Sequence, residues 1–276
     1  MKENLPIITL LTDFGLEDEY VGVMKGVILS INNRVHLVDI THSVGRHDVM
    51  QAALVINASF RYFPKGSIHI VVVDPGVGGK RKVICLKKEG HFFLAPDNGI
   101  LSLIVGDGKV DGICQVTNQA YFLTPVSGTF HGRDIFAPVA AHLSSGVDMF
   151  RLGEKTGISD IVRLDIHAPS ISSDDELIGE ILSIDRFGNL VTNIDFKLFE
   201  TFIKETKLKD ITVNLGKFKI KGVSGSYEAV EIGSPVALFG SRNSLEISVN
   251  QGDARIYFGA SVGQTVRVSR RPARIP

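Results

Sequence analysis

The stretch LPIITLLTDFG, residues 5–15, decides the fold. Its first part, residues 5–11, is a continuous apolar run of the kind found in strands that are buried on both faces, and it ends at the polar turn TDFG. Residues 20–31 follow with apolar side chains at helical spacing. A buried strand that leads directly into an amphipathic helix begins a βαβ unit, so this stretch predicts a sheet with parallel strands.

The same alternation continues along the first half of the chain. Further strands are predicted at residues 35–40, 67–73, 82–86, 91–95 and 120–123, and further helices at residues 49–60 and 133–144. The early strands are separated by helices, while the later ones follow one another more closely. We therefore expect an α/β domain whose mainly parallel sheet is flanked by helices.

The second half of the chain is almost wholly β in pattern. A small, polar segment at residues 168–176 follows a strand-like stretch at 161–166 and is the best linker candidate. Beyond it, short strands are predicted at residues 177–184, 190–194, 211–215, 218–223, 235–239, 245–249, 255–258 and 264–268. A short helix at 195–204 interrupts them. The prediction is an α/β domain at 1–168 and an all-β, barrel-like C-terminal domain at 176–276.

Composition excludes several classes of protein. Of 276 residues, 44% are hydrophobic and 22% charged, which excludes disordered and fibrous chains. Lys plus Arg number 30 and Asp plus Glu 30, so the chain lacks the basic excess of a nucleic-acid binder. Two cysteines, Cys85 and Cys114, make no disulfide framework and are expected to be buried and reduced. No apolar run is long enough for a bilayer, which favours a soluble, cytoplasmic protein.

Polar residues gather where the predicted strands end. They are Asp13, Asp39, His42, Asp74, Asp97 and Asn98. Two glycine-rich turns, at residues 74–81 and 127–134, add Arg81 and His131. Ligands of parallel sheets bind at the carboxyl ends of the strands, so these groups are candidates for one site. Each alone also fits a turn, a helix cap or an exposed loop.

Two polar clusters stand out in the second half. They are DRFGN at residues 185–189 and FGSR at residues 239–242, both within apolar β surroundings. Hairpin turns would explain both clusters without any function.

In the first half, a salt bridge between Asp74 and Arg81 would keep the carboxylate ionised and fix its direction.

Several of these stretches together resemble the S-adenosylmethionine hydroxide adenosyltransferase family, which is related to fluorinating and chlorinating enzymes. The matching stretches are TDFG (12–15), VVVDPGVGG (71–79), APDNG (95–99), SGTFHGRDIFAP (127–138) and DRFGNLVTNI (185–194). They span most of the chain. The resemblance implies an N-terminal α/β domain, a C-terminal β-barrel and a homotrimer, in which each active site lies between the first domain of one subunit and the second domain of its neighbour.

The resemblance also implies a role for each site residue. Asp13 would hold the ribose hydroxyls, and Asn189 would face the adenine. Asp74, Arg81 and His131 would surround the reactive water. Asp185, Ser241 and Arg242 would hold the amino and carboxylate groups of methionine. The implied activity is hydrolysis of S-adenosyl-L-methionine to adenosine and L-methionine by attack of water on the ribose 5′ carbon, with no metal and no cofactor.

The halogenating relatives differ from this chain around the nucleophile. They place small hydroxyl donors around a halide, whereas the corresponding positions here are Asp74, Val77, His131 and Gly132. A carboxylate repels a halide and glycine has no hydroxyl, so the sequence favours water as the nucleophile.

Two alternatives do not depend on the resemblance. A metal-dependent hydrolase would use Asp13, Asp39, Asp74 and His131 as oxygen and nitrogen ligands, although no tight metal motif is present. A non-catalytic nucleoside-binding module would use the same strand ends to bind a ligand without turnover.

Overall fold

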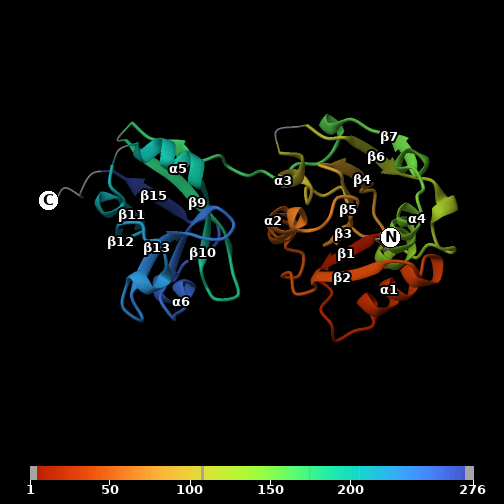
Figure 1. The fold of residues 1–276 in the computed structure, drawn as a ribbon, viewed down its shortest axis with the longest axis horizontal. Coiled ribbons are helices and arrows are strands. Elements are labelled where there is room, and N and C mark those ends of the chain that lie inside the picture. Colours follow the sequence, from red (N-terminus) through yellow and green to blue (C-terminus); the bar gives the residue numbers. More distant parts are fainter. Residues whose placement is uncertain (1–4, 107–108, 174, 205, 271–276) are drawn as a thin grey trace. The chain divides into compact units, whose positions relative to one another are not determined.

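The computed structural model describes residues 5–106, 109–173, 175–204 and 206–270, and it divides into two compact units between Leu164 and Asp165 (Figure 1). This division lies before the linker that was predicted at residues 168–176. The reason is that strand β8 (Ser170–Ile171) already pairs with strand β9 (Glu176–Ile184) of the second unit. Each unit is described by itself below.

The first unit is an α/β unit. Its strands are β1 (Ile7–Thr12), β2 (His36–Thr41), β3 (Ile68–Val72), β4 (Val83–Lys88), β5 (His91–Pro96), β6 (Gly112–Val116) and β7 (Gly153–Lys155). Its helices are α1 (Tyr20–Ile31), α2 (Val49–Ser59), α3 (Ser102–Val105) and α4 (Ala137–Ser144). Among the described residues the strands form one sheet in the order β2-β1-β3-β5-β4-β6-β7.

This sheet is mixed rather than mainly parallel. Strands β2, β1, β3 and β5 run parallel, while β4, β6 and β7 join the β5 edge by antiparallel pairing. The change of direction arises because β4 and β5 are connected by the short turn at Glu89 and Gly90, both with positive φ. A parallel pair needs a long crossover, and this connection is too short for one.

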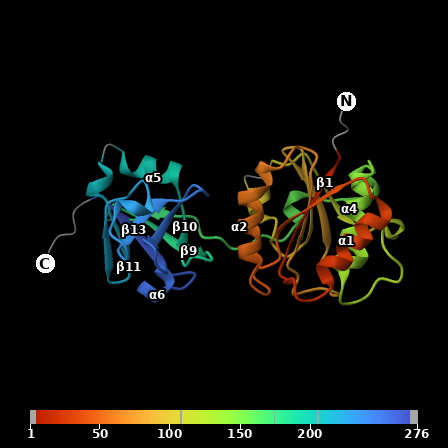
Figure 2. The same cartoon turned by 60° about the horizontal axis from the view of Figure 1, so that its bottom comes forward.

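Helices cover both faces of the sheet, as expected. Helices α1 and α4 pack on one face, against side chains such as Leu10 and Ile70, and helices α2 and α3 pack on the other face, against Leu11 and Val71 (Figure 2). Successive residues of a strand point to opposite faces, which is why Leu10 and Leu11 belong to different cores. The continuous apolar run at the start of the chain is therefore a strand buried on both sides.

The second unit is a nearly closed antiparallel barrel. Its strands, besides β8 and β9, are β10 (Leu190–Asp195), β11 (Thr212–Leu215), β12 (Phe218–Lys221), β13 (Pro235–Phe239), β14 (Ser244–Val249) and β15 (Thr265–Ser269). Its helices are α5 (Phe196–Ile203) and α6 (Ala254–Phe258). In the described part of the chain the strand order is β12-β11-β15-β9-β10-β14-β13. The Ser224 amide donates to the Ala237 carbonyl at 2.8 Å, which links the segment after β12 to β13 and brings the sheet close to closure.

Three local predictions were wrong. Residues 120–123 contain a 3₁₀ turn, Gln119–Tyr121, instead of a strand. Residues 161–166 form no strand, because the amides of Val162 and Leu164 donate to the Asp97 and Ser102 side chains instead of to a neighbouring strand. Residues 255–258 belong to helix α6, which begins where the Asp253 side chain accepts the Ile256 amide at 2.9 Å.

The two cysteines lie opposite each other on adjacent antiparallel strands. Cys85 of β4 and Cys114 of β6 are both buried and free, as predicted. The Cys114 thiol donates to the Met149 carbonyl at 3.2 Å.

Among the helices of the described residues, none is long and apolar enough to cross a membrane.

A buried histidine pair lies in the first unit. The Nδ1 atom of His69, on β3, is 2.8 Å from the Thr9 hydroxyl, and its Nε2 atom is 3.3 Å from Nδ1 of His91. Both rings are buried and pack against Phe60. Burial, and to a lesser degree the neighbouring His91, lower the pKa of His69 from 6.5 to about 3.

This histidine predicts an acid-dependent loss of stability. Because the pKa of His69 is lower in the folded state, the unfolded chain takes up the proton first as the pH falls below 6.5, and stability is lost progressively toward pH 3. Between pH 6.5 and about 4.5, the wild type should lose roughly 1–3 kcal/mol more unfolding free energy than a His69→Gln variant. Urea unfolding at several pH values measures this difference. A His36→Gln variant, altered at an exposed histidine, should follow the wild type.

Candidate active site

Two glycine-rich loops meet in the first unit. One loop follows β3 and contains Gly78, and the other precedes α4 and contains Gly128. Gly78 has a φ of +75°, and a Cβ atom built on it would lie 1.9 Å from the Gly128 carbonyl oxygen. Only glycine permits so close a contact of two backbones. The two glycine-rich turns predicted to carry site residues, at 74–81 and 127–134, are therefore in direct contact.

Arg81 connects the side chains of these loops. Its Nε and Nη2 atoms donate to Oδ2 of Asp74 at 2.8 and 2.5 Å, and Nη2 also contacts Nδ1 of His131 at 2.7 Å. The side chains of Arg81 and Asp74 are only 10% and 4% exposed. Such a buried, charge-assisted pair has a fixed geometry. The structure thus brings together Asp74, Arg81 and His131, as the sequence predicted.

This contact determines which nitrogen of His131 carries the proton. A guanidinium can only donate hydrogen bonds, so Nδ1 of His131 must accept, and the proton of the neutral ring is assigned to Nε2. Burial, and next the positive charge of Arg81, lower the pKa of His131. The ring is therefore neutral at neutral pH, and its Nε2 atom is a hydrogen-bond donor.

The second oxygen of Asp74 has the opposite character. Oδ1 is buried and has no hydrogen-bond partner among the described residues. A buried acceptor that lacks a partner is costly, and native structures rarely leave one without a ligand or an ordered water to satisfy it. Asp74 therefore offers a strong, directed acceptor to a small polar molecule beside the Arg81 pair.

Hydrogen bonds from side chains to the backbone hold the surrounding loops in place. The Asn98 side-chain amide donates to the Val73 carbonyl at 2.8 Å, directly before Asp74. The buried Asp134 carboxylate accepts the Ser127 amide at 2.8 Å and lies in a π-helical segment, Gly132–Phe136, directly after His131. Asp97 and Asn98, candidates at the strand ends, thus hold backbone in place rather than joining the cluster.

Asp13 lies at the same edge of the sheet. Thr12 is paired with Val72 in the parallel register of β1 and β3, so Asp13 follows the strand next to the one that ends before Asp74. Its Oδ2 atom accepts the backbone amide of His47 at 2.9 Å. This single bond leaves acceptor capacity on the carboxylate. No direct contact joins Asp13 to the Arg81 cluster in the described structure.

The ligand set proposed for a metal does not form. Asp39 contacts Lys25 at 2.6 Å, and the buried His42 lies between Asp39 and the Thr12 hydroxyl. Asp74 is instead paired with Arg81. Among the described residues, no group of three or more His, Cys, Asp or Glu side chains is arranged to hold a metal ion. Among these residues, the four ligands predicted for the metal-dependent alternative are therefore not brought together.

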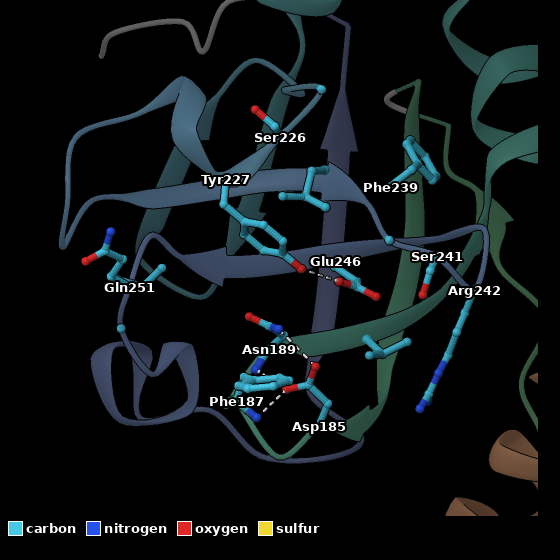
Figure 3. A pocket seen from close by; sticks show the side chains of 16 residues that line it. Asp185, Phe187, Asn189, Ser226, Tyr227, Phe239, Ser241, Arg242, Glu246 and Gln251 are labelled. Atoms are coloured by element: carbon cyan, nitrogen blue, oxygen red, sulfur yellow. Dashed lines mark hydrogen bonds between the residues drawn. The ribbon is translucent and has the colours of Figure 1, made fainter.

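The second unit contains a pocket of about 900 Å³ (Figure 3). All four site residues predicted in this half line it: Asp185, Asn189, Ser241 and Arg242. The turn after β9 supplies the first two, and the turn between β13 and β14 supplies the others. The sequence therefore located both polar clusters of one pocket.

Asp185 also shapes its own turn. Its Oδ1 atom accepts the amides of Phe187 and Asn189, each at 2.9 Å, and its Oδ2 atom accepts the Asn189 side-chain amide at 2.9 Å. The hairpin interpretation of residues 185–189 is thus correct as well. Most of the acceptor capacity of this carboxylate is used within the turn.

The sequence analysis above did not predict the polar pocket residues Glu246 and Tyr227, which bond to each other. Glu246 of β14 is buried and points into the pocket, where the Tyr227 hydroxyl donates to its Oε2 atom at 3.3 Å (Figure 3). Burial is the main cause that raises the pKa of Glu246. In the segment LEISV a glutamate alternates with apolar residues, which reads as an exposed position on a strand. Only the tertiary structure shows that this face is covered.

Comparison with known proteins assigns the chain to a family. The model of the SAM hydroxide adenosyltransferase N-terminal domain matches residues 8–153, and that of the C-terminal domain matches residues 179–267. The chain belongs to the SAM hydroxide adenosyltransferase family. The two matched regions correspond to the α/β unit and the barrel unit.

Individual members of the family and their relatives match over nearly the whole chain. The (R)-S-adenosyl-L-methionine hydrolase of Thermus thermophilus is 31% identical over 95% of this chain and 98% of its own. A fluorinase of Nocardia brasiliensis is 27% identical over 95% and 96%. The crystal structure of an uncharacterized conserved protein from Thermotoga maritima, 37% identical, superposes with a TM-score of 0.88 over 95% of this chain and all of that one.

Gly132, directly after His131, is closely packed. A Cβ atom on Gly132 would lie 3.0 Å from the sulfur of Met24 and 3.1 Å from the ring of Phe130. Any side chain here, including one with a hydroxyl donor, requires these neighbours to shift. The packing around His131 is therefore matched to glycine.

The contact between the two loops is tested by a pair of alanine variants. Gly78→Ala places a Cβ atom against the Gly128 carbonyl at a positive φ, so it should lower the unfolding free energy by at least ~1 kcal/mol. Gly128→Ala is the matched control, because its Cβ atom meets nothing within 4 Å. Urea unfolding measures the unfolding free energy of both variants. Equal stabilities would contradict the close backbone contact.

Proposed function

We propose that this protein hydrolyses S-adenosyl-L-methionine to adenosine and L-methionine, by in-line attack of a water molecule on the ribose 5′ carbon. The observation that carries the proposal is the buried Oδ1 atom of Asp74, an acceptor without a partner in the described structure, held beside Arg81 and His131. The family and the hydrolase names of its relatives support it.

The chemistry requires positioning more than acid catalysis. A sulfonium makes methionine a neutral leaving group, so the departing sulfur needs no proton and no metal ion. Water is the weak partner, and it gains nucleophilicity from an acceptor that takes a hydrogen bond from it. Asp74 Oδ1 supplies that acceptor. As the water oxygen bonds to the 5′ carbon and the bond between that carbon and the sulfur breaks, the proton that the water loses passes to this carboxylate and from it to solvent. His131 Nε2 carries a proton and so acts as a donor that orients the water instead of as its base.

The remaining site residues follow the family pattern. The Asp13 carboxylate holds the two ribose hydroxyls, and Asn189 faces the adenine. Asp185, Ser241 and Arg242 hold the amino and carboxylate groups of methionine. Support comes from the free acceptor capacity of Asp13 and from the shared pocket that the other residues line.

The assembly and cellular context are part of the same proposal. The protein is a cytoplasmic homotrimer that needs no cofactor and binds no nucleic acid. In it the domain at residues 1–168 holds the nucleoside and water, and the domain at 176–276 of a neighbouring subunit closes the site. The near-equal numbers of acidic and basic residues support the absence of a nucleic-acid partner. Light scattering coupled to size-exclusion chromatography tests the trimer.

The products and the nucleophile are tested by isotope labelling. In water enriched with heavy oxygen, each sulfonium epimer of S-adenosyl-L-methionine is incubated with the protein, with and without a chelator. Labelled adenosine, carrying the heavy oxygen at its 5′ hydroxyl in both conditions, is expected. A halogenated nucleoside as the main product in chloride or fluoride would identify a halogenase. Loss of turnover with chelator would identify a metal enzyme, and tight binding without turnover a binding module.

The water-activating role is tested by single-turnover kinetics. Asp74→Asn and His131→Ala should each lower the rate of the chemical step by about 10²–10⁴-fold, with much smaller effects on substrate affinity. Their effects should not multiply in the double variant, because acceptor and orienting group act on one water. His36→Ala is the control at an exposed histidine. Variants that retain the wild-type rate but bind weakly would assign both residues to recognition instead.

The nucleoside-binding role of Asp13 is tested by calorimetric titration with adenosine. Each lost hydrogen bond to a charged group costs roughly 1.5–3 kcal/mol, so Asp13→Ala should weaken adenosine binding by at least about tenfold. Affinity for L-methionine should not change, which serves as the internal control. Unchanged adenosine affinity would leave Asp13 as a residue that only anchors the His47 amide.

A further inference from the structure

Glu246 lies at the centre of the pocket floor in the second unit. Its cross-strand neighbours are Val191 of β10 and Leu238 of β13, and both also line the pocket. The residues on either side of it, Leu245 and Ile247, point into the core of the barrel. Glu246 thus lies on the outer face of the barrel sheet, yet it is only 6% exposed. Glutamate is almost never buried to this degree without a charged partner.

The backbone around Glu246 is shaped to admit its carboxylate. A Cβ atom on Gly240 would lie 1.9 Å from Oε1 of Glu246, so the glycine leaves the space that the carboxylate occupies. The same turn carries Ser241 and Arg242. In Figure 3 the carboxylate of Glu246 lies between Tyr227 and Ser241, with Asp185 and Asn189 across the pocket. The pocket therefore has a specific space for the Glu246 carboxylate.

Glu246 has far more acceptor capacity left than Asp185. The Asp185 oxygens accept from two backbone amides and one side-chain amide. Within the described residues, the hydrogen bond recorded for Glu246 comes from the Tyr227 hydroxyl at 3.3 Å, which is long for a bond between two oxygens. A carboxylate has about four lone-pair positions, so Glu246 is open to further donors.

The charges of the pocket are also unbalanced. Two carboxylates, Asp185 and Glu246, share it with one guanidinium, that of Arg242. Burial and the charge of Asp185 raise the pKa of Glu246, while the Tyr227 hydroxyl and Arg242 oppose this rise. A cation with several N–H donors would satisfy the free oxygens and supply the missing charge.

We propose that Glu246 is a further acceptor, beside Asp185, for the α-ammonium group of an amino-acid moiety bound in this pocket. The inference rests on the proposed function for the identity of that ligand. An α-amino acid carries one ammonium and one carboxylate, which match Glu246 on one side and Ser241 with Arg242 on the other. Glu246 is therefore a specificity-determining residue for ligands that carry the amino group.

Binding of two unreactive probes tests the proposal. S-adenosyl-L-homocysteine carries the ammonium group but no sulfonium, and 5′-S-(3-carboxypropyl)-5′-thioadenosine is the same molecule without its amino group. Glu246→Gln should weaken binding of the first probe by about tenfold or more. It should change binding of the deamino probe by less than about threefold. Glu228→Gln is the matched control, an exposed glutamate outside the pocket lining.

A second measurement uses the wild-type protein and depends on no variant. The pKa of Glu246 is raised in the free protein, and a bound cation favours the ionised carboxylate. Calorimetry over a series of pH values from 4 to 7, in buffers of different ionisation enthalpy, should therefore detect proton release with S-adenosyl-L-homocysteine at the acidic end of the series. The deamino probe should release less. The groups facing Glu246 are Asp185, Tyr227 and Arg242, and all three are present in both titrations.

The outcomes separate this inference from the proposed function. Neither probe is a substrate for hydrolysis, so the binding result does not depend on turnover. Equal losses for both probes in Glu246→Gln, or no loss for either, would overturn the role of Glu246 even in an active hydrolase. A selective loss for the amino-bearing probe, together with no hydrolysis of S-adenosyl-L-methionine, would support the role and reject the proposed reaction.

Discussion

The guanidinium of Arg81 is the interaction on which the first-unit site depends. It bonds Asp74 in its own loop and His131 in a loop fifty positions further along the chain. One planar cation thereby determines the direction of a carboxylate, the proton position of an imidazole and the distance between two loops. Lysine carries the same charge but has no fixed fork of donors, so it would not impose all three. The glycine contact between the loops makes this short bridge geometrically feasible.

Both candidate sites contain a buried carboxylate whose bonding is incomplete. Asp74 has one oxygen engaged by Arg81 and one without a partner in the described structure, and Glu246 has a single long bond from Tyr227. In an ordinary core such groups would be destabilising. In the proposals above, each accepts a hydrogen bond from a group that arrives with the reaction, a water for Asp74 and an ammonium group for Glu246. The cost of leaving these groups unsatisfied is offset when the ligand binds.

The sequence predicted much of this arrangement for identifiable reasons. The buried strand at the start of the chain and the helix at Tyr20–Ile31 have patterns set by their own burial, and the helix has the predicted bounds. The cluster of Asp74, Arg81 and His131 was predictable because two glycine-rich turns place these residues at one sheet edge and because their motifs resemble those of the family. The antiparallel pairing of β4 with β5 was not predicted, although the strands expected at residues 82–86 and 91–95 are too close in sequence for the long crossover that a parallel pair needs. Helix α6 was missed because its Asp253 cap outweighs the β-like composition of the residues that follow.

The burial of Glu246 could not be predicted from the sequence. Its alternation with Leu245 and Ile247 correctly indicates a strand and correctly places the glutamate on the opposite face. Whether that face is open to solvent depends on Tyr227 and on the turn at Gly240, which lie elsewhere in the chain. No local pattern carries that information. The same holds for Asp97 and Asn98, whose position at a strand end suggested a site role although they bond to backbone.

The absence of a side chain at Gly132 constrains how this protein can change over evolutionary time. A serine introduced there meets the Met24 sulfur on helix α1 and the Phe130 ring before it can serve any new nucleophile. A smaller residue at position 24 would remove the first of these contacts and, taken alone, leaves the Asp74–Arg81–His131 bridge untouched. The Met24 side chain must move by a few tenths of an ångström to admit a Cβ atom at position 132, so a smaller residue at position 24 would make a side chain there easier to accommodate. Directed evolution of this scaffold toward another nucleophile should therefore vary positions 24 and 132 together in one library.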